Sequence, residues 1–240
     1  MMDIPAIVRN VSKCPTCMLA KAFGIKPRGA EGWIDKKVYW RFFPFKRDGV
    51  MVEVGAAGPD FLSVGKYYRS KGWKVLSVEP NPTFAEMHRK AGNIIHQVAC
   101  SDHDSDGVPF QIVEDTNDPY ITEEALSSLE IRRTYIERNP DYCSRMITRN
   151  IQVNVRRLDT ILAEEGNQHI DLLLVDTEGW EIQVMEGLSI NPRIVVLEDM
   201  DMYHDSSTSD SYQSYMEQRG YKLVFSSMWN YVYEDKTTCS

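Results

Sequence analysis

Acidic side chains follow three short apolar runs of this sequence, each at the point where the run ends. The acids and their runs are Glu79 after Lys74–Val78, Asp176 after Leu172–Val175, and Glu198 with Asp199 after residues 194–197. Short apolar runs are typical of strands buried on both faces of a parallel sheet, and open sheets of this kind bind ligands at the carboxyl ends of their strands. The sequence therefore predicts a functional edge where these carboxylates gather.

Glu79 belongs to a strand–turn–helix–strand pattern. The run Val50–Val54 is followed at once by Gly55 and Gly58, which permit a sharp turn and a ligand close to the backbone. A helix is predicted over residues 60–71, and Glu79 then ends the second strand, where an acid can accept hydrogen bonds from both hydroxyls of a ribose. The pattern predicts a nucleoside-containing cofactor, and the alternative is a βαβ unit without a ligand.

The turn departs from the G-x-G-x-x-G pattern of a dinucleotide site, where a pyrophosphate rests on a helix N-terminus. Ala57 replaces the middle glycine, Pro59 removes an amide donor and Asp60 adds a negative charge. These features disfavour a pyrophosphate and suit a cationic nucleoside such as S-adenosylmethionine (SAM), with Glu53 near its charged end. The predicted cofactor-binding residues are Glu53, Gly55, Ala57, Gly58, Glu79, Pro80, Ser101 and Asp102.

The last two of these residues follow a third predicted strand, over residues 93–99. Polar residues at this point lie beside the adenine in a doubly wound fold, so Asp102 is the candidate contact for the exocyclic amine. The alternative is a turn or helix cap, since Ser-Asp favours turns. Between the second and third strands, Thr83 is predicted to cap a helix that ends near Ala91, with Glu86 completing a capping box.

The remaining acids predict chemistry beside the cofactor. Asp176, Glu198 and Asp199 would converge if their strands are neighbours, and three carboxylates repel one another unless they are protonated, hydrogen-bonded or neutralised by a cation. A hard ion such as Mg²⁺ takes oxygen ligands of this kind and acidifies a bound hydroxyl. The alternative is a set of solvated carboxylates that cap helix N-termini.

Composition limits the classes of protein. The 240 residues carry a net charge of −8, which argues against general nucleic-acid binding. Residues 1–49 hold ten Lys or Arg against four Asp or Glu, a net of +6, so the rest carries −14. No apolar run approaches the roughly 18 residues of a membrane span, and no secretory segment is recognised, which favours a cytoplasmic protein. Self-association into a homo-oligomer is left open.

Five cysteines, an odd number, fit a reducing compartment better than a disulfide framework. Cys14 and Cys17 form a lone C-x-x-C. A zinc site needs two further soft ligands, and a redox site needs a different βαβ context, so both cysteines are interpreted as ordinary residues at a helix start.

Two segments lie outside the strand–helix pattern. Residues 36–47 interleave cations with aromatics, a mixture that can contact a substrate, a nucleic-acid strand or a lipid surface. The favoured alternative is that the aromatics pack against the sheet edge while the cations face water, and a flap over the substrate is the best functional option. Residues 114–150 are rich in charged and turn residues and predict a lid insertion that carries a helix near 123–136.

Five stretches resemble FkbM-type SAM-dependent methyltransferases: VEVGAAGPDF, SVEPNP, VACSDHD, IQVNVRRLDTIL and IDLLLVDTEGWEIQVMEGL. They are similar, in the family's order, to a VDVGAN-like turn, FEPNP, an ALSD-like strand, a V-x-V-x-x-LD segment and KIDVEGxExxVLxGA. The likeness covers about residues 49–200, and the E-G-x-E element is its more specific part. Ala57 stands where the family often has Asn, and Leu174 where Lys is usual.

The resemblance implies a class I methyltransferase (Rossmann-like) doubly wound sheet over residues 49–240, after an N-terminal extension (1–48). It implies SAM across Gly55, Glu79 and Asp102, and O-methylation of a sugar or natural-product hydroxyl. The Glu198–Asp199 pair also resembles the metal-binding pair of macrocin-type sugar O-methyltransferases, which hold Mg²⁺ with a further Asp.

Methyl transfer from SAM would require an aligned hydroxyl and a base. The candidate catalytic residues are Asp176, Glu178, Glu181 and His204. His204 would act beside a metal, or lie on the surface as the alternative, whereas Glu178 or Glu181 would act without one. Two rival functions are a nicotinamide-dependent oxidoreductase and a non-catalytic SAM-binding protein that recruits a partner through the segment around Trp40.

Overall fold

The structure is a computed structural model that describes residues 30–60, 63–114, 127–129, 147–167, 169–198 and 209–238. Its helical elements are η1 (Glu31–Trp33), α3 (Ile34–Phe42), α4 (Val64–Ser70), α5 (Pro82–Lys90), α8 (Leu158–Glu164), α9 (Glu181–Glu186), α10 (Ser209–Gln218) and η3 (Lys236–Thr238). Its strands are β1 (Val50–Val54), β2 (Lys74–Val78), β3 (Ile94–His96), β4 (Ala99–Cys100), β5 (Ser105–Glu114), β6 (Ile147–Arg156), β7 (Leu172–Val175), β8 (Ile194–Glu198), β9 (Tyr221–Ser227) and β10 (Asn230–Asp235).

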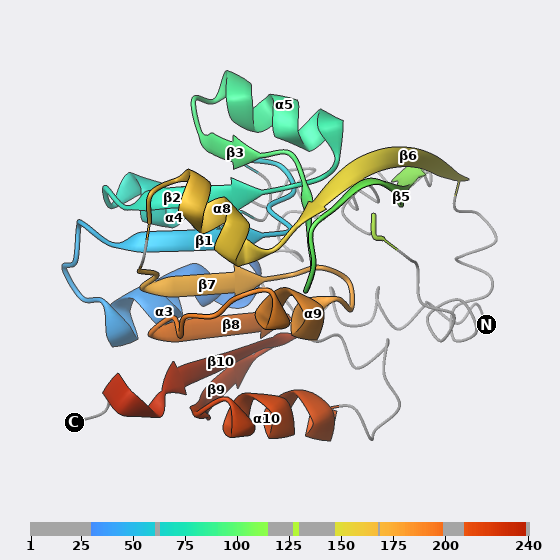
Figure 1. Cartoon of the computed structure of the whole chain (residues 1–240). Coiled ribbons are helices and arrows are strands. Elements are labelled where there is room, and N and C mark those ends of the chain that lie inside the picture. Colours follow the sequence, from blue (N-terminus) through green and yellow to red (C-terminus); the bar gives the residue numbers. More distant parts are fainter. Residues whose placement is uncertain are drawn as a thin grey trace, which may run out of the picture.

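Seven of these strands form one twisted sheet in the order β3-β2-β1-β7-β8-β10-β9 (Figure 1). The first five pair in parallel, and β10 joins β8 and β9 in antiparallel fashion. The chain moves outward from β1 to β3 and returns to the other side of β1 as β7. The carboxyl ends of β1 and β7 therefore form the switch point at which open α/β sheets bind ligands, and the predicted doubly wound fold is confirmed.

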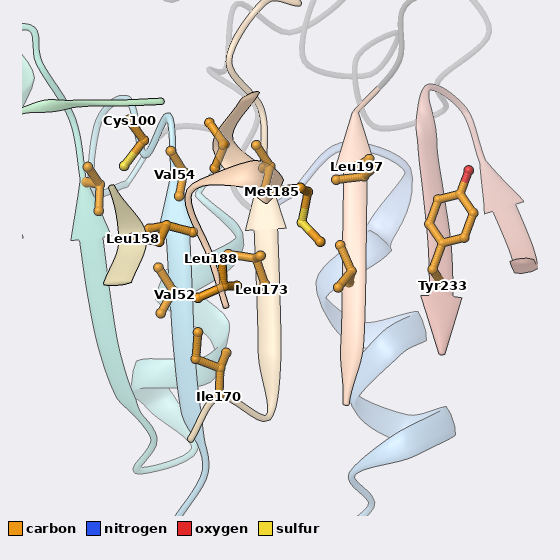
Figure 2. Close-up of a cluster of buried hydrophobic side chains, with 14 of the residues drawn as sticks. Val52, Val54, Cys100, Leu158, Ile170, Leu173, Met185, Leu188, Leu197 and Tyr233 are labelled. Atoms are coloured by element: carbon orange, nitrogen blue, oxygen red, sulfur yellow. The ribbon is translucent and has the colours of Figure 1, made fainter. Parts of the chain in front are cut away.

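Helices cover both faces of the sheet, so the strands are buried on both sides (Figure 1). Alternate strand residues point to opposite faces: Val52 and Val54 join one apolar cluster, while Met51 joins the other. The first cluster lies under α8, α9 and α10, and Figure 2 shows Val52, Leu173 and Leu197 among its side chains. The second lies under α3 and α4.

The helix α3 lies within the segment predicted as an N-terminal extension. Its buried side chains include Ile34, Val38 and Tyr39, and they pack in the same cluster as Met51 of β1 and Val196 of β8. The aromatic–basic segment therefore covers a face of the sheet instead of its edge, which corrects the favoured interpretation of its position. Residues 1–29, with Cys14 and Cys17, lie outside the described residues.

Several predicted boundaries were wrong for local reasons. The crossover helix begins at Val64, not at residue 60, because the Ser63 side chain accepts the Lys66 amide proton as its N-cap. The next helix is capped by Asn81, whose side chain accepts from the Thr83 amide and is followed by Pro82 at the first helical position. Thr83 is therefore not the cap.

A second, smaller sheet projects from the main one. It has the order β4-β6-β5, and β5 pairs with β6 in antiparallel fashion. The predicted third strand is divided: β3 stays in the main sheet, whereas β4 pairs with β6. Residues 115–126 and 130–146, which include the helix predicted near 123–136, lie outside the described residues, so the lid stays a prediction.

Candidate functional site

Gly55 begins the turn after β1 at the switch point. Its backbone has a φ of +77°, which L side chains rarely adopt, and a Cβ atom there would lie 1.7 Å from the Asp176 carbonyl oxygen. The Gly55 amide also donates to the Val78 carbonyl at 3.0 Å. Only glycine therefore lets the loops that follow β1, β2 and β7 meet at this edge.

Glu79 lies at the end of β2, directly beside this turn. Its side chain is buried, and the two carboxylate oxygens accept from the Ala57 amide at 2.9 Å and from the Asn81 amide at 2.8 Å. Burial raises the pKa of Glu79 to about 7, against the opposing effect of these two hydrogen bonds. The neighbouring charges of Asp176 and Glu53 raise the pKa further.

This shifted carboxyl makes the stability of the fold depend on pH. Because the pKa of Glu79 rises from 4.5 to about 7 on folding, the folded state binds more protons than the unfolded state between these values. The contribution of Glu79 to stability is thus complete below about pH 4.5 and is lost as the pH rises through about 7, a change of about 3 kcal/mol.

Urea unfolding of the wild type and of Glu79→Gln across this pH range measures the effect. The difference between the two free energies of unfolding should change by about 3 kcal/mol, since the groups remote from Glu79 titrate alike in both proteins and cancel. If the free energies of unfolding of the two proteins instead change equally with pH, Glu79 titrates near its ordinary pKa.

Ala57 occupies the middle of the turn and is held from both sides. Its φ of +43° is unusual for a residue other than glycine. The amide donates to Glu79, and the carbonyl accepts from Nε2 of His88 at 3.0 Å. His88 is buried, and its Nδ1 lies 3.1 Å from the side-chain nitrogen Nδ2 of Asn93, so the network assigns a neutral ring whose Nδ1 accepts from Asn93. Burial also lowers the pKa of His88.

We predict that His88 positions this turn for ligand binding. His88→Leu removes the donor to Ala57 and should destabilise the protein by about 1–3 kcal/mol through a buried, unpaired carbonyl. His88→Gln places an amide nitrogen near the position of Nε2 and should recover most of the loss. Urea unfolding and SAM titration of both variants provide the measurement. Equal losses of stability and of SAM affinity in the Leu and Gln variants would rule out the hydrogen bond to Ala57 as the cause of those losses.

The other residues predicted to bind the cofactor near the turn are placed in different ways. Glu53 turns to the face covered by α4, where it is 1% exposed, accepts from the Gly65 amide at 2.8 Å and lies 3.9 Å from Nη1 of Arg69. Burial raises its pKa and Arg69 opposes the rise. Gly58 is buried and Pro80 is half-buried. Their contacts with a cofactor stay predictions.

Ser101 and Asp102 follow β4. Ser101 is buried, and its hydroxyl donates to the exposed Asp102 carboxylate at 3.0 Å. Asp102 also accepts from Nδ1 of His103 at 2.6 Å, and this hydrogen bond is the main cause that lowers the pKa of Asp102. The carboxylate thus stays ionised, which suits it to accept a hydrogen bond from the exocyclic amine of an adenine. That contact remains a prediction.

The predicted catalytic acids of the loop after β7 differ in their surroundings. Asp176 and Glu178 are half-buried, and Glu178 has a φ of +55°. Glu181 is buried: one oxygen accepts from the amides of Thr177 and Gly179 at 3.0 and 2.9 Å, and the other from the Tyr212 hydroxyl at 2.7 Å. These bonds favour a role for Glu181 in holding the loop, although the predicted catalytic role is untested.

The predicted metal ligands are only partly described. Asp176 directly follows β7, and Glu198 ends the neighbouring strand β8, as expected. Asp199 and the predicted base His204 lie outside the described residues. Within the described parts of the chain, no group of three or more His, Cys, Asp or Glu side chains is arranged to hold a metal ion. The Mg²⁺ site therefore stays a prediction.

Comparison with known proteins agrees with the resemblance stated above. No protein of curated function matches the sequence. A crystal structure of an O-methyltransferase from Bacillus cereus in complex with SAH is similar, with 11% identity over 95% of this chain and 96% of that one, but its TM-score of 0.37 is too low to support any inference. Residues 53–223, most of the chain, match the family described as "Methyltransferase FkbM domain". The chain therefore belongs to the FkbM methyltransferase family.

Proposed function

We propose that this protein is a SAM-dependent O-methyltransferase that acts on a hydroxyl of a small molecule or glycan. The observation that carries the proposal is the buried carboxylate of Glu79, held by the amides of Ala57 and Asn81 at the switch point. Each of its oxygens has a further lone pair, and together they suit the two hydroxyls of a ribose. Family membership supports the transfer of a methyl group.

The charge of the site favours a cation over a dinucleotide. Burial raises the pKa of Glu79, and the nearby negative charges of Asp176 and Glu53 raise it further, so additional negative charge at this turn is unfavourable. A pyrophosphate would add two more negative charges here, whereas a sulfonium with an amino group would reduce the repulsion. This observation supports SAM over NADH, the cofactor of the rival oxidoreductase.

The reaction assigns separate tasks to the residues of this edge. Bound SAM would supply an electrophilic methyl group, so the protein must align the acceptor oxygen and accept its proton. Asp176 and Glu178 follow β7 beside the turn, and we propose one of them as the base. Glu181 fixes their loop through the Thr177 and Gly179 amides. If Mg²⁺ takes part, Asp176, Glu198 and Asp199 would hold it, and the ion would lower the pKa of the acceptor hydroxyl.

Calorimetric titration with SAM, S-adenosylhomocysteine and NADH, each with and without Mg²⁺, tests the proposal. We expect both adenosyl ligands to bind and NADH to give no heat of binding. Binding of NADH in place of SAM would overturn the proposal. Unchanged activity in a chelator would remove the metal from the mechanism. SAM binding without turnover on any of a panel of hydroxylated acceptors would favour the rival non-catalytic function.

A further inference from the structure

The outer face of α3 carries exposed aromatic and cationic side chains that the proposed methyl transfer does not use. We call it the α3 outer face, and its residues are Trp33, Lys36, Lys37, Trp40, Arg41 and Phe45. Trp33, Trp40 and Phe45 are 51%, 53% and 79% exposed, more than any other exposed large hydrophobic residue in the described part of the chain. Isolated exposed apolar residues need no explanation, but a cluster does.

Helical spacing brings these side chains to one side. Trp40 lies four positions after Lys36 and three after Lys37, so these three side chains share one side of α3, and Trp33 directly precedes the helix. The rings of Trp40 and Phe45 touch edge to face with centroids 5.6 Å apart, and Nζ of Lys36 lies 4.3 Å from the centroid of Trp33. The aromatic and basic groups therefore form one continuous patch.

The fold maintains this exposure. The opposite side of α3 is buried against the sheet through Ile34, Val38 and Tyr39, so the outer aromatics have no room in the core. Trp33 and Phe45 also have φ values of +63° and +68°, a conformation that bulky side chains rarely adopt. Backbone held in such conformations clusters at functional sites, and here it displays two aromatic rings to solvent.

The charge of the patch is opposite to that of the protein. Residues 30–49 hold five Lys or Arg against three Asp or Glu, a net of +2, in a chain whose total is −8. Asp35, the acid within α3, is buried, and burial raises its pKa, so the outer face keeps its positive character. An anionic surface would repel the acidic rest of the protein and attract the patch, so the protein would approach such a surface with the patch facing it.

Nucleic acids and anionic lipid bilayers are the two kinds of anionic partner that bind clusters of aromatic and basic residues. Nucleobases bind by stacking on the accessible faces of aromatic side chains. Here Trp40 and Phe45 are inclined at 84° to each other, and Lys36 covers the face of Trp33. A bilayer interface requires only apolar area flanked by cations, at the depth where Trp rings prefer to lie. The arrangement favours lipid.

We propose that the α3 outer face docks this protein on the surface of a bilayer that contains anionic lipids, with Trp40 and Phe45 entering the headgroup region and Lys36 and Arg41 contacting the headgroups. The association is peripheral. Among the described residues, no helix is long and apolar enough to cross a membrane.

Cosedimentation of the full chain with vesicles tests the proposal. We expect binding to vesicles of phosphatidylcholine mixed with phosphatidylserine, and at least about tenfold weaker binding to phosphatidylcholine alone or at high salt. Lys36→Glu with Arg41→Glu should weaken binding to the anionic vesicles by at least about tenfold. Arg89→Glu with Lys90→Glu, on the exposed face of α5, makes the same change in net charge and should have little effect.

A second pair of variants separates docking from folding. Asn tolerates positive φ, so Phe45→Asn should not lower the stability of the protein. Phe45→Asn combined with Trp40→Gln should weaken vesicle binding by at least about tenfold. Ile94→Asn with Leu223→Gln removes exposed apolar side chains elsewhere and serves as the control. Thermal unfolding verifies that all variants remain folded.

Several outcomes would overturn the proposal. These are equal binding to neutral and anionic vesicles, equal losses in the test and control variants, or no binding at all. A patch-dependent dimer in sedimentation, or patch-dependent binding to single-stranded nucleic acid without binding to vesicles, would assign the surface to another partner. The proposal is independent of the proposed methyl transfer, since SAM titration can succeed or fail in either case.

Discussion

Replacing Gly55 by alanine should destabilise the protein by about 4 kcal/mol or more, enough to unfold a domain of ordinary stability. The new Cβ would lie 1.7 Å from the Asp176 carbonyl oxygen, and the φ of +77° adds backbone strain. Because the loop after β7 cannot move without disturbing the β1–β7 pairing, the structure offers no small adjustment. Urea unfolding measures the loss, and SAM titration should show no binding by the variant.

Gly58→Ala is the matched control from the same turn. A Cβ there would meet Met87 and Phe84 at 3.7 and 3.8 Å, which are ordinary van der Waals distances. We expect a loss of less than about 1 kcal/mol. Similar losses for both variants would mean that the close approach of Gly55 to Asp176 does not limit the fold.

Glu79→Gln should weaken SAM binding by at least about 30-fold. Both carboxylate oxygens accept amide protons, from Ala57 and Asn81, so an amide side chain must place its NH₂ against one of these donors. The variant also loses the charge that would accept the ribose hydroxyls. Calorimetric titration at about pH 8, where the wild-type side chain is ionised, provides the measurement.

Glu86→Gln on the exposed side of α5 is the control, and it should bind SAM as the wild type does. The wild type should also release protons on binding SAM at about pH 6, because a ligand that prefers ionised Glu79 shifts its titration. Titrations in two buffers of different ionisation enthalpy detect this release. Unchanged affinity of Glu79→Gln would place the ribose elsewhere.

The strand–turn–helix–strand unit could be predicted because its information is local. The apolar run before Gly55 and the acid at Glu79 lie within thirty residues of each other, and the structure places both as expected. Helix starts were harder, since Asn81 and Thr83 are both good caps. Pro82, which favours the first helical position, was the signal that identifies Asn81.

Contacts between distant segments could not be predicted from one sequence. His88 reaches the Ala57 carbonyl across 31 positions, and a lone histidine on a helix gives no sign of it. The orientation of Glu53 was accessible, because strand residues alternate and Val52 and Val54 face the opposite cluster. The strand β5 was overlooked, although Val108, Phe110 and Ile112 alternate with other residues in the pattern of a strand.

The position of β10 has a consequence for synthesis on the ribosome. This strand is made after all the others, yet it lies between β8 and β9 (Figure 1). Until it emerges, β8 has no partner on one side and β9 cannot join the sheet. The nascent chain thus presents an open apolar edge, a site at which strands of other chains can pair. Chaperone demand during translation should therefore persist until the last strand of the sheet is released.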